Sequence, residues 1–194
     1  KAFVLLSLLF FSVVNLNART QNAYLDSLLK MEVVMPRDTN KVRLLLNISD
    51  AYLEDDFLKA LKYGQKAQKL AEETNFLQGR LDALLNICYA NDFLGRYGEA
   101  QKQNFELLAI YEREEDSAQI NACYNNIGII HYYLGNFKES IKATEKALNY
   151  FIQVGDIDGE SICYNNIANC YSDMFDYETA LEYYFKALEL EEKM

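Results

Sequence analysis

Hydrophobic residues between positions 117 and 156 recur with the period of an α-helix. A first stripe contains Tyr124, Ile127, Ile130 (or His131) and Leu134, at intervals of three or four residues. Gly135-Asn136 interrupts the pattern and predicts the end of this helix. A second helical pattern runs from Phe137 to Val154, with an inward face of Ile141, Ala147, Leu148 and Phe151. Gly155-Asp156 then predicts a helix C-terminus followed by the cap of the next helix.

The same pair of patterns occurs four times along the chain. Segments that begin at Leu84, Tyr124 and Tyr164 align at a spacing of 40 residues, and a fourth begins at Leu45 with one residue fewer in its turn. A period of this length is typical of stacked helical repeats. We predict an array over residues 38–194 with four units, 38–76, 77–116, 117–156 and 157–194. Uncovered apolar residues in the last unit, Tyr183, Phe185 and Leu188, lead us to expect that the array continues beyond 194.

Small residues occupy two positions of every unit. One position holds Ser49, Cys88, Gly128 and Ala168, and the other holds Ala60, Ala100, Ser140 and Ala180. A large side chain at either position would push the two helices of a unit apart. We therefore expect both positions to be buried at close helix contacts.

Composition supports a helical fold and excludes several classes of protein. The 194 residues include one proline and eight glycines, too few for the turns of a β-sandwich or barrel. Hydrophobic residues make up 51%, which excludes wholesale disorder. The formal net charge of −10 repels phosphate backbones, so we expect no nucleic-acid binding. Most of the net negative charge lies in residues 157–194, where a solvated acidic face explains it.

The first 18 residues have the pattern of a secretory signal peptide. An apolar run over residues 2–14 follows Lys1, and it is too short to span a bilayer but long enough for the core of a signal sequence. A buried N-terminal helix is the alternative. We interpret residues 1–18 as a signal-peptide-like segment with cleavage near Ala18. Residues 19–37 are then a lead-in with a short helix from Tyr24 to Val34, in a periplasmic or otherwise exported protein.

No convincing catalytic or metal-binding constellation is found. The candidate soft ligands are Cys88, Cys123, Cys163, Cys170 and the single histidine, His131, and none form a C-x-x-C pair. Their spacing does not suit a zinc site, so we expect four buried cysteines and a histidine that packs in the core. Acidic pairs such as Asp55-Asp56 stand at helix junctions, where capping explains them. We expect no enzymatic activity, no metal and no cofactor.

The repeats resemble the tetratricopeptide repeat (TPR) over residues 38–194. The family pattern W-x2-L-G-x2-Y…A-x3-F…A is met best in the last unit, at Tyr164, Ile167, Ala168, Tyr171, Ala180, Tyr184 and Ala187. The third unit has His131 at the tyrosine position, and the usual terminal proline is absent throughout. The long period is similar to that of kinesin light chains, Leu-Gly-Asn-repeat polarity proteins and bacterial peptide-sensing regulators. The resemblance implies an all-α fold, a right-handed α-solenoid of helix-turn-helix repeats.

Asparagines recur on the first helix of every unit. The set is Asn47, Asn86, Asn125, Asn126, Asn165, Asn166 and Asn169. The resemblance implies that the first helices line a concave groove and that long-period TPR proteins use such asparagine ladders on bound peptides. A carboxamide can donate to a peptide C=O and accept from its N–H. The set therefore predicts a peptide-binding groove. The alternative is that these amides bond to neighbouring helices or water and only tune the superhelix.

Aromatic and charged residues refine this prediction. We expect four aromatic side chains either to form side pockets along the groove or to lie in the core or on the convex face. They are Tyr89, Phe93, Tyr132 and Tyr133. The carboxylate clamp of chaperone-adaptor TPRs requires Lys and Arg on the groove face. Here the main basic candidate is Arg43, and the matching positions hold Asp82, Ala122, Asn125 and Asn126. We therefore do not expect binding to the C-terminal tails of chaperones.

The expected function is binding of a protein or peptide ligand in the concave groove, without membrane binding by the repeats themselves. The segment from Asp38 to Leu45 resembles the start of exported TPR regions in Bacteroidetes-type signalling proteins. This resemblance implies the sensory part of a larger signalling protein, with any membrane tether beyond residue 194. The alternative is a stand-alone adaptor for assembly of a protein complex. No motif supports a hydrolase or a transferase.

Overall fold

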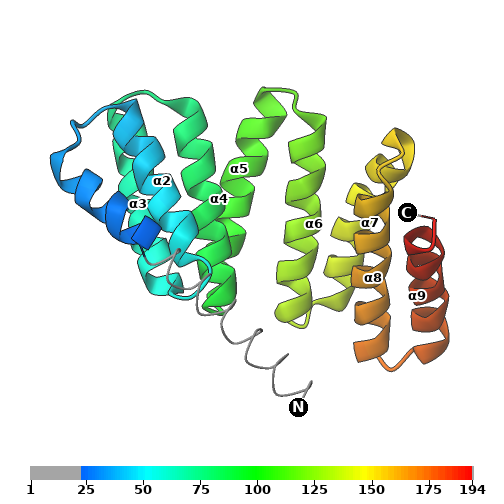
Figure 1. Ribbon diagram of the computed structural model, residues 1–194. Coiled ribbons are helices and arrows are strands. Elements are labelled where there is room, and N and C mark those ends of the chain that lie inside the picture. Colours follow the sequence, from blue (N-terminus) through cyan, green and yellow to red (C-terminus); the bar gives the residue numbers. More distant parts are fainter. Residues whose placement is uncertain (1–22, 194) are drawn as a thin grey trace, which may run out of the picture. The chain divides into compact units, whose positions relative to one another are not determined.

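The computed structural model describes residues 23–193, so the signal-like segment predicted over residues 1–18 lies outside the described residues. All regular structure in the described part is helical (Figure 1). A helical stretch at 23–34 precedes eight helices. They are α2 (Thr39–Tyr52), α3 (Phe57–Glu73), α4 (Leu77–Phe93), α5 (Tyr97–Arg113), α6 (Ser117–Tyr133), α7 (Phe137–Val154), α8 (Ile157–Asp173) and α9 (Tyr177–Glu191).

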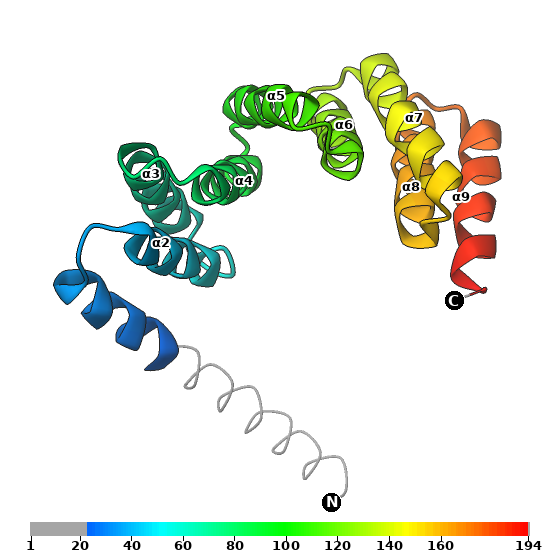
Figure 2. The same cartoon turned by 90° about the horizontal axis from the view of Figure 1, so that it is seen from above.

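The chain divides into two compact units, Lys1–Leu94 and Gly95–Met194. In the described part of the first unit, α3 packs against both α2 and α4. In the second unit, each helix from α5 to α9 packs against the next one along the chain, as Figures 1 and 2 show. The division falls between α4 and α5, within the repeat predicted over residues 77–116.

Aspartates and glycines set the ends of the helices. The side chains of five aspartates accept hydrogen bonds from backbone N–H groups at the starts of helices; they are Asp38, Asp56, Asp116, Asp156 and Asp176. Gly155 ends α7 with a φ of 73°, a left-handed conformation that costs glycine little because it lacks a Cβ. The predicted roles of Gly155 and Asp156 are confirmed.

Each unit has a core of its own. In the first unit, Ile48 of α2 packs with Ala60 of α3 and Ile87 of α4. In the second unit, Leu148 of α7 packs with Ile167 of α8 in one cluster. The eight small residues predicted at close helix contacts are all buried.

One predicted core position is wrong. Leu134 is 43% exposed, although its spacing placed it on the apolar stripe of the third repeat. The reason is that α6 ends at Tyr133, so Leu134 begins the turn toward Gly135 and leaves the buried face of the helix. Ile127 and Ile130 of the same stripe are buried, and His131 is half-buried.

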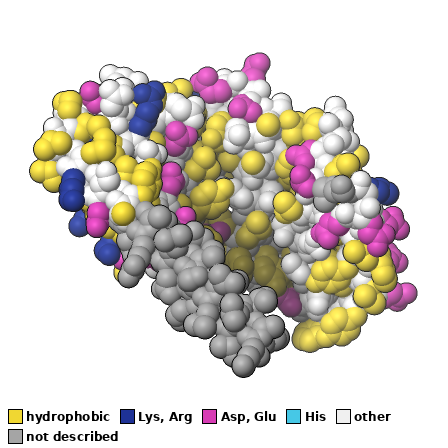
Figure 3. All heavy atoms as spheres, viewed as in Figure 1, with side chains coloured by type: hydrophobic (Ala, Val, Ile, Leu, Met, Phe, Trp, Pro, Cys, Tyr) yellow, Lys and Arg dark blue, Asp and Glu magenta, His cyan; other side chains and the backbone are white. Residues whose placement is uncertain are grey.

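The last helix leaves hydrophobic side chains exposed. Phe185 is 60% exposed and Leu188 is 47% exposed, as the sequence predicted. Tyr183 differs from the prediction because it is half-buried and stacks on Tyr171, with 5.7 Å between ring centroids. On the face seen in Figure 3, hydrophobic and acidic side chains lie together over the C-terminal helices.

Candidate functional site

The predicted asparagines lie on α2, α4, α6 and α8, the first helices of the four predicted repeats. Their surroundings differ from one repeat to the next. Asn47 is exposed and Asn86 is buried, with only 8% of its surface exposed. The five asparagines of the second unit are half-buried. The sequence position is therefore repeated, but the accessibility of the amide is not.

In the first unit, the asparagine position is linked to an aspartate. The Asn86 side chain donates a 2.6 Å hydrogen bond to Asp50 Oδ1, which joins α4 to α2. Burial raises the pKa of the Asp50 carboxyl above its usual value, the bond from Asn86 opposes that rise, and Asp82 adds to it. Asn47 and Asp50 border a cavity of about 280 Å³ together with Glu54. This part of the first unit therefore presents carboxylates rather than a row of amides.

In the second unit, asparagines of neighbouring first helices bond to one another. Asn166 Nδ2 of α8 donates to Asn125 Oδ1 of α6 at 3.0 Å. The same oxygen accepts a weak bond from the Cys163 thiol at 3.8 Å. Asn165 donates to the carbonyl of Ser161 within its own helix, at 3.2 Å. The Asn125–Asn166 bond uses one donor and one acceptor, and it aligns α6 with α8.

A cavity of about 170 Å³ lies between α6 and α8 and combines amides with aromatic rings. It is lined by Ile129, Tyr132, Tyr133, Ser140, Asn166 and Asn169. We call it the α6–α8 cavity. The predicted asparagines Asn166 and Asn169 and the predicted aromatic residues Tyr132 and Tyr133 thus lie in one site. Asn47, Asn86, Asn125, Asn126 and Asn165 do not line it.

The polar groups of the α6–α8 cavity are neutral and oriented. Asn169 Oδ1 accepts from the Tyr184 hydroxyl at 2.6 Å, which holds the Asn169 amide in place. The hydrogen bond from Tyr132 to Asp173, together with burial, raises the pKa of Tyr132 to about 12, so its hydroxyl stays protonated at neutral pH. Among the described residues, no group donates to Asn166 Oδ1 and none accepts from Asn169 Nδ2. One acceptor and one amide donor therefore remain available in the cavity.

Tyr133 gives the cavity an exposed aromatic wall. Its side chain is 56% exposed and stacks on Tyr97 of α5, with ring centroids 5.1 Å apart and planes inclined by 3°. Tyr132 meets Tyr133 edge to face at 5.4 Å. Aromatic surface of this kind contributes binding energy with little loss of side-chain freedom, since a tyrosine has few rotatable bonds.

Sequence reasoning missed Asp50 and Ile129 as site residues. Asp50, Tyr89, Ile129 and Asn169 stand at the same position of the four predicted repeats, three residues after the asparagine position. The shared position was the signal in the sequence that could have identified these residues. It is hard to recognise because the four repeats have an acidic, an aromatic, an aliphatic and an amide residue there. Ser140 was predicted only as a small packing residue, and it also lines the α6–α8 cavity.

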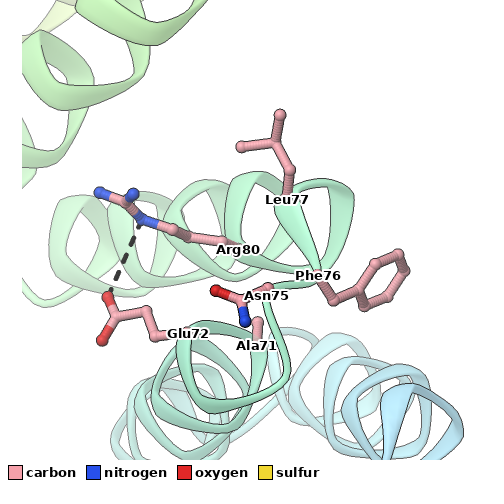
Figure 4. Close-up of a pocket in the computed structure, with 6 residues that line it drawn as sticks. All are labelled: Ala71, Glu72, Asn75, Phe76, Leu77 and Arg80. Carbon is pink, nitrogen blue, oxygen red and sulfur yellow. Dashed lines mark ion pairs between the residues drawn. The ribbon is translucent and has the colours of Figure 1, made fainter.

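Another cavity contains none of the predicted site residues. It measures about 280 Å³ and lies where α3 turns into α4 (Figure 4). Arg80 faces Glu72 across 3.8 Å on one side of this cavity, while the Phe76 ring points away from that pair. The ring of Phe76 instead lies under the guanidinium of Arg43, at 5.0 Å. The basic candidate for a carboxylate clamp thus stacks on an aromatic ring of the same unit.

The chemistry of the cysteines is that of buried residues. All four are buried, as predicted. Burial raises the pKa of Cys123 to about 11 and that of Cys163 to about 12, so both thiols are protonated at neutral pH. Residues 23–193 contain no cluster of three or more potential metal ligands. In the same range, no helix has the length and apolar character needed to cross a membrane.

Comparisons with known proteins agree with this architecture. The tetratricopeptide repeat family profile matches residues 119–193. No curated protein matches the chain. A Rap protein complexed with competence and sporulation factor is similar in structure, with a TM-score of 0.72 and 17% identity over 92% of this chain and 51% of that one. A signal transduction ATPase with a tetratricopeptide repeat sensor from Pyrococcus horikoshii has a TM-score of 0.77 and 22% identity, over 92% of this chain and 28% of that one.

A third similar structure has nearly the same extent as this chain. The putative kinesin light chain repeats of Podosopora anserina have a TM-score of 0.72 and 13% identity, covering 92% of this chain and 93% of that one. By contrast, the chain spans about half the length of the Rap proteins that it matches. The helix pairs, the buried small residues and these matches lead to one conclusion. Residues 119–193 match the tetratricopeptide repeat profile, and the described part of the chain has the fold of an all-α tetratricopeptide-repeat solenoid.

Proposed function

We propose that this chain is a non-enzymatic scaffold that binds an extended peptide segment of a partner protein. The observation that carries the proposal is the α6–α8 cavity, where an available acceptor of Asn166 and an available donor of Asn169 lie beside Tyr132 and Tyr133. A peptide backbone needs one donor and one acceptor per residue, and a side chain needs an apolar recess. The cavity offers both.

The lining of the cavity indicates which side chain it prefers. None of its six residues carries a formal charge at neutral pH, so a charged partner side chain would lose hydration without gaining an ion pair. A cavity of about 150 Å³ in another protein accommodates benzene, and this one measures about 170 Å³. The preferred occupant is therefore one apolar or aromatic side chain, such as leucine or phenylalanine.

The first unit is proposed to favour a different kind of partner group. Asp50 and Glu54 border the cavity beside Asn47, and Asp82 is close enough to Asp50 to raise its pKa. An arginine or lysine of a partner placed there would neutralise this negative charge. The preference for a basic group in the first unit is thus independent of the preference for an apolar group in the second.

We further propose that the chain is the exported sensory part of a larger signalling protein. The signal-like pattern over residues 1–18 supports export, and one similar structure is described as a sensor within a signal transduction ATPase. A stand-alone adaptor for assembly of a protein complex is the second candidate. The reading frame after Met194 separates them, because a membrane helix and an output domain favour the sensor, whereas a stop codon favours the adaptor.

Peptide binding is testable without knowing the natural partner. Peptides selected from a phage-displayed random library on the whole chain are measured by calorimetry against Asn169→Ala and Tyr133→Ala. Both variants should weaken binding by about tenfold, since each removes a hydrogen bond or an aromatic contact of roughly 1–2 kcal/mol. Asn149→Ala is the matched control, because Asn149 is exposed on α7 and does not line the cavity. Equal affinity of all three variants and the wild type refutes this site.

A further inference from the structure

A third cavity in the first unit carries positive charge, opposite in sign to the chain as a whole. It measures about 280 Å³ and lies where residues 23–37, the start of α2 and the end of α3 meet. Four cationic side chains line it, Arg37, Lys41, Lys66 and Lys69, with Glu32 as the one acidic residue and two leucines. Lys and Arg side chains also gather over the N-terminal helices on the face seen in Figure 3. The chain has a net charge of −10, so this basic cavity is a positively charged region of an acidic protein.

The single carboxylate of the basic cavity is already bound on both oxygens. Glu32 Oε1 accepts from Lys66 Nζ at 2.7 Å, and Glu32 Oε2 accepts from the Tyr63 hydroxyl at 3.2 Å. Burial and the charge of Glu32 raise the pKa of Tyr63 to about 12, so Tyr63 remains a donor. Glu32 therefore balances Lys66 and has little capacity to balance a second cation.

Lys41 is held in place by neutral partners. Its ammonium donates to the backbone carbonyls of Glu32, at 2.8 Å, and of Met35, at 3.1 Å. Carbonyls are neutral, so these bonds position the ammonium but leave the positive charge uncompensated. The Asp38 carboxylate accepts from the backbone N–H groups of Asn40 and Lys41, at 3.0 and 3.1 Å, as the cap of α2.

Arg37 and Lys69 supply exposed donors. One terminal nitrogen of Arg37 lies 2.5 Å from Glu73, and a guanidinium has further N–H groups that can face a ligand. The Arg37 side chain is 65% exposed, and Lys69 is also exposed. The site thus combines an ammonium held by backbone carbonyls with two exposed cationic side chains, and its lining has more positive than negative charge.

We propose that the basic cavity binds a phosphate group, either as inorganic phosphate or as a small phosphate monoester. Guanidinium and ammonium groups are the usual phosphate ligands of proteins, and Arg37, Lys41 and Lys69 line this cavity. A bound phosphate would join Arg37 and Lys41, at the start of the array, to Lys69 on α3. The site is separate from the proposed peptide-binding residues, none of which lines it.

The test uses the whole chain with inorganic phosphate and with glycerol phosphate as probes. Each is titrated by calorimetry and by thermal unfolding, against sodium chloride at equal ionic strength. Saturable binding with one site per chain is expected for at least one probe, together with a rise in Tm that chloride does not produce. Saturation by glycerol phosphate alone identifies a monoester site, and saturation by inorganic phosphate identifies a site for the free anion. Failure of both probes to exceed chloride overturns the proposal.

Variants locate the binding within the chain. Arg37→Gln combined with Lys69→Gln should weaken phosphate binding by about tenfold or more, because it removes two charge-assisted donors. Both side chains are exposed, so helicity by circular dichroism should not change, and Lys69→Gln alone provides a milder variant. Lys62→Gln is the matched control, since Lys62 is exposed on α3 and does not line the cavity. A loss with Lys62→Gln as large as with the double variant would mean non-specific attraction to lysines and would also overturn the proposal.

Discussion

Gly128 offers a direct test of the close helix contact in the third repeat. A Cβ built on Gly128 of α6 would lie 2.3 Å from Thr144 Oγ1 of α7, 3.2 Å from the Ser140 carbonyl oxygen and 3.3 Å from the Thr144 backbone nitrogen. The first distance requires a shift of the Thr144 side chain, which is fully buried. The other two involve backbone atoms of α7, so the helices themselves must also move slightly apart.

The magnitude follows from two opposing contributions to the free energy of unfolding. Replacing glycine by alanine inside a helix stabilises it by about 1 kcal/mol. Overpacking of a well-packed contact costs about 1–3 kcal/mol, and the 2.3 Å contact places Gly128→Ala toward the upper end of that range. The net expectation is a destabilisation of about 1–2 kcal/mol, measured as a lower midpoint of urea unfolding followed by circular dichroism.

Gly98→Ala is the matched control for Gly128→Ala. Gly98 lies in α5, and a Cβ there would meet no atom within 4 Å. The same chemical change should therefore stabilise the chain, by about 0.5–1 kcal/mol. In a Thr144→Ala background, the cost of Gly128→Ala should fall by about 1 kcal/mol, because the closest contact is gone. If Gly128→Ala is as stable as the wild type while Gly98→Ala gains stability, the packing argument fails.

Three further predictions concern a buried hydroxyl, the Asp50 carboxyl and two buried thiols. Thr144→Val should stabilise the chain by about 1 kcal/mol in urea unfolding, because Thr144 Oγ1 is buried without a hydrogen-bond partner among the described residues; a loss of stability would mean that the hydroxyl is satisfied. Asp50→Asn should raise stability at neutral pH while keeping an acceptor for Asn86. The difference in free energy of unfolding between Asp50→Asn and the wild type should shrink as the pH falls toward the raised pKa of Asp50. Protonation of Asp50 in the folded wild type then removes the cost of desolvating its charge, so a pH-independent difference would contradict this. Native Cys123 and Cys163 should resist iodoacetamide at mildly alkaline pH and react after unfolding, as read by mass spectrometry; rapid native labelling would show that these thiols are not buried.

Local sequence information was sufficient for the helices and for much of their packing. The second helix of the third repeat was predicted from Phe137 to Val154, and α7 has those bounds. Hydrophobic periodicity and the capping preferences of Gly155 and Asp156 act within a few residues, so they can be recognised in the sequence alone. Leu134 shows the limit of such reasoning, because periodicity alone does not specify the residue at which the buried face ends.

Only the tertiary structure decided which partner each asparagine side chain bonds to. Asn86 and Asn166 stand at the same repeat position, yet one is bonded to Asp50 and the other to Asn125, residues 36 and 41 positions away in the sequence. The identity of such a partner depends on how neighbouring first helices are rotated and spaced, which no local pattern encodes. The sequence by itself determined that helical hairpins form and which small residues they bury. Only their packing determined that Asn169 and Tyr133 line a cavity while Asn86 is buried, since a hydrogen bond between helices exists only once the helices are placed.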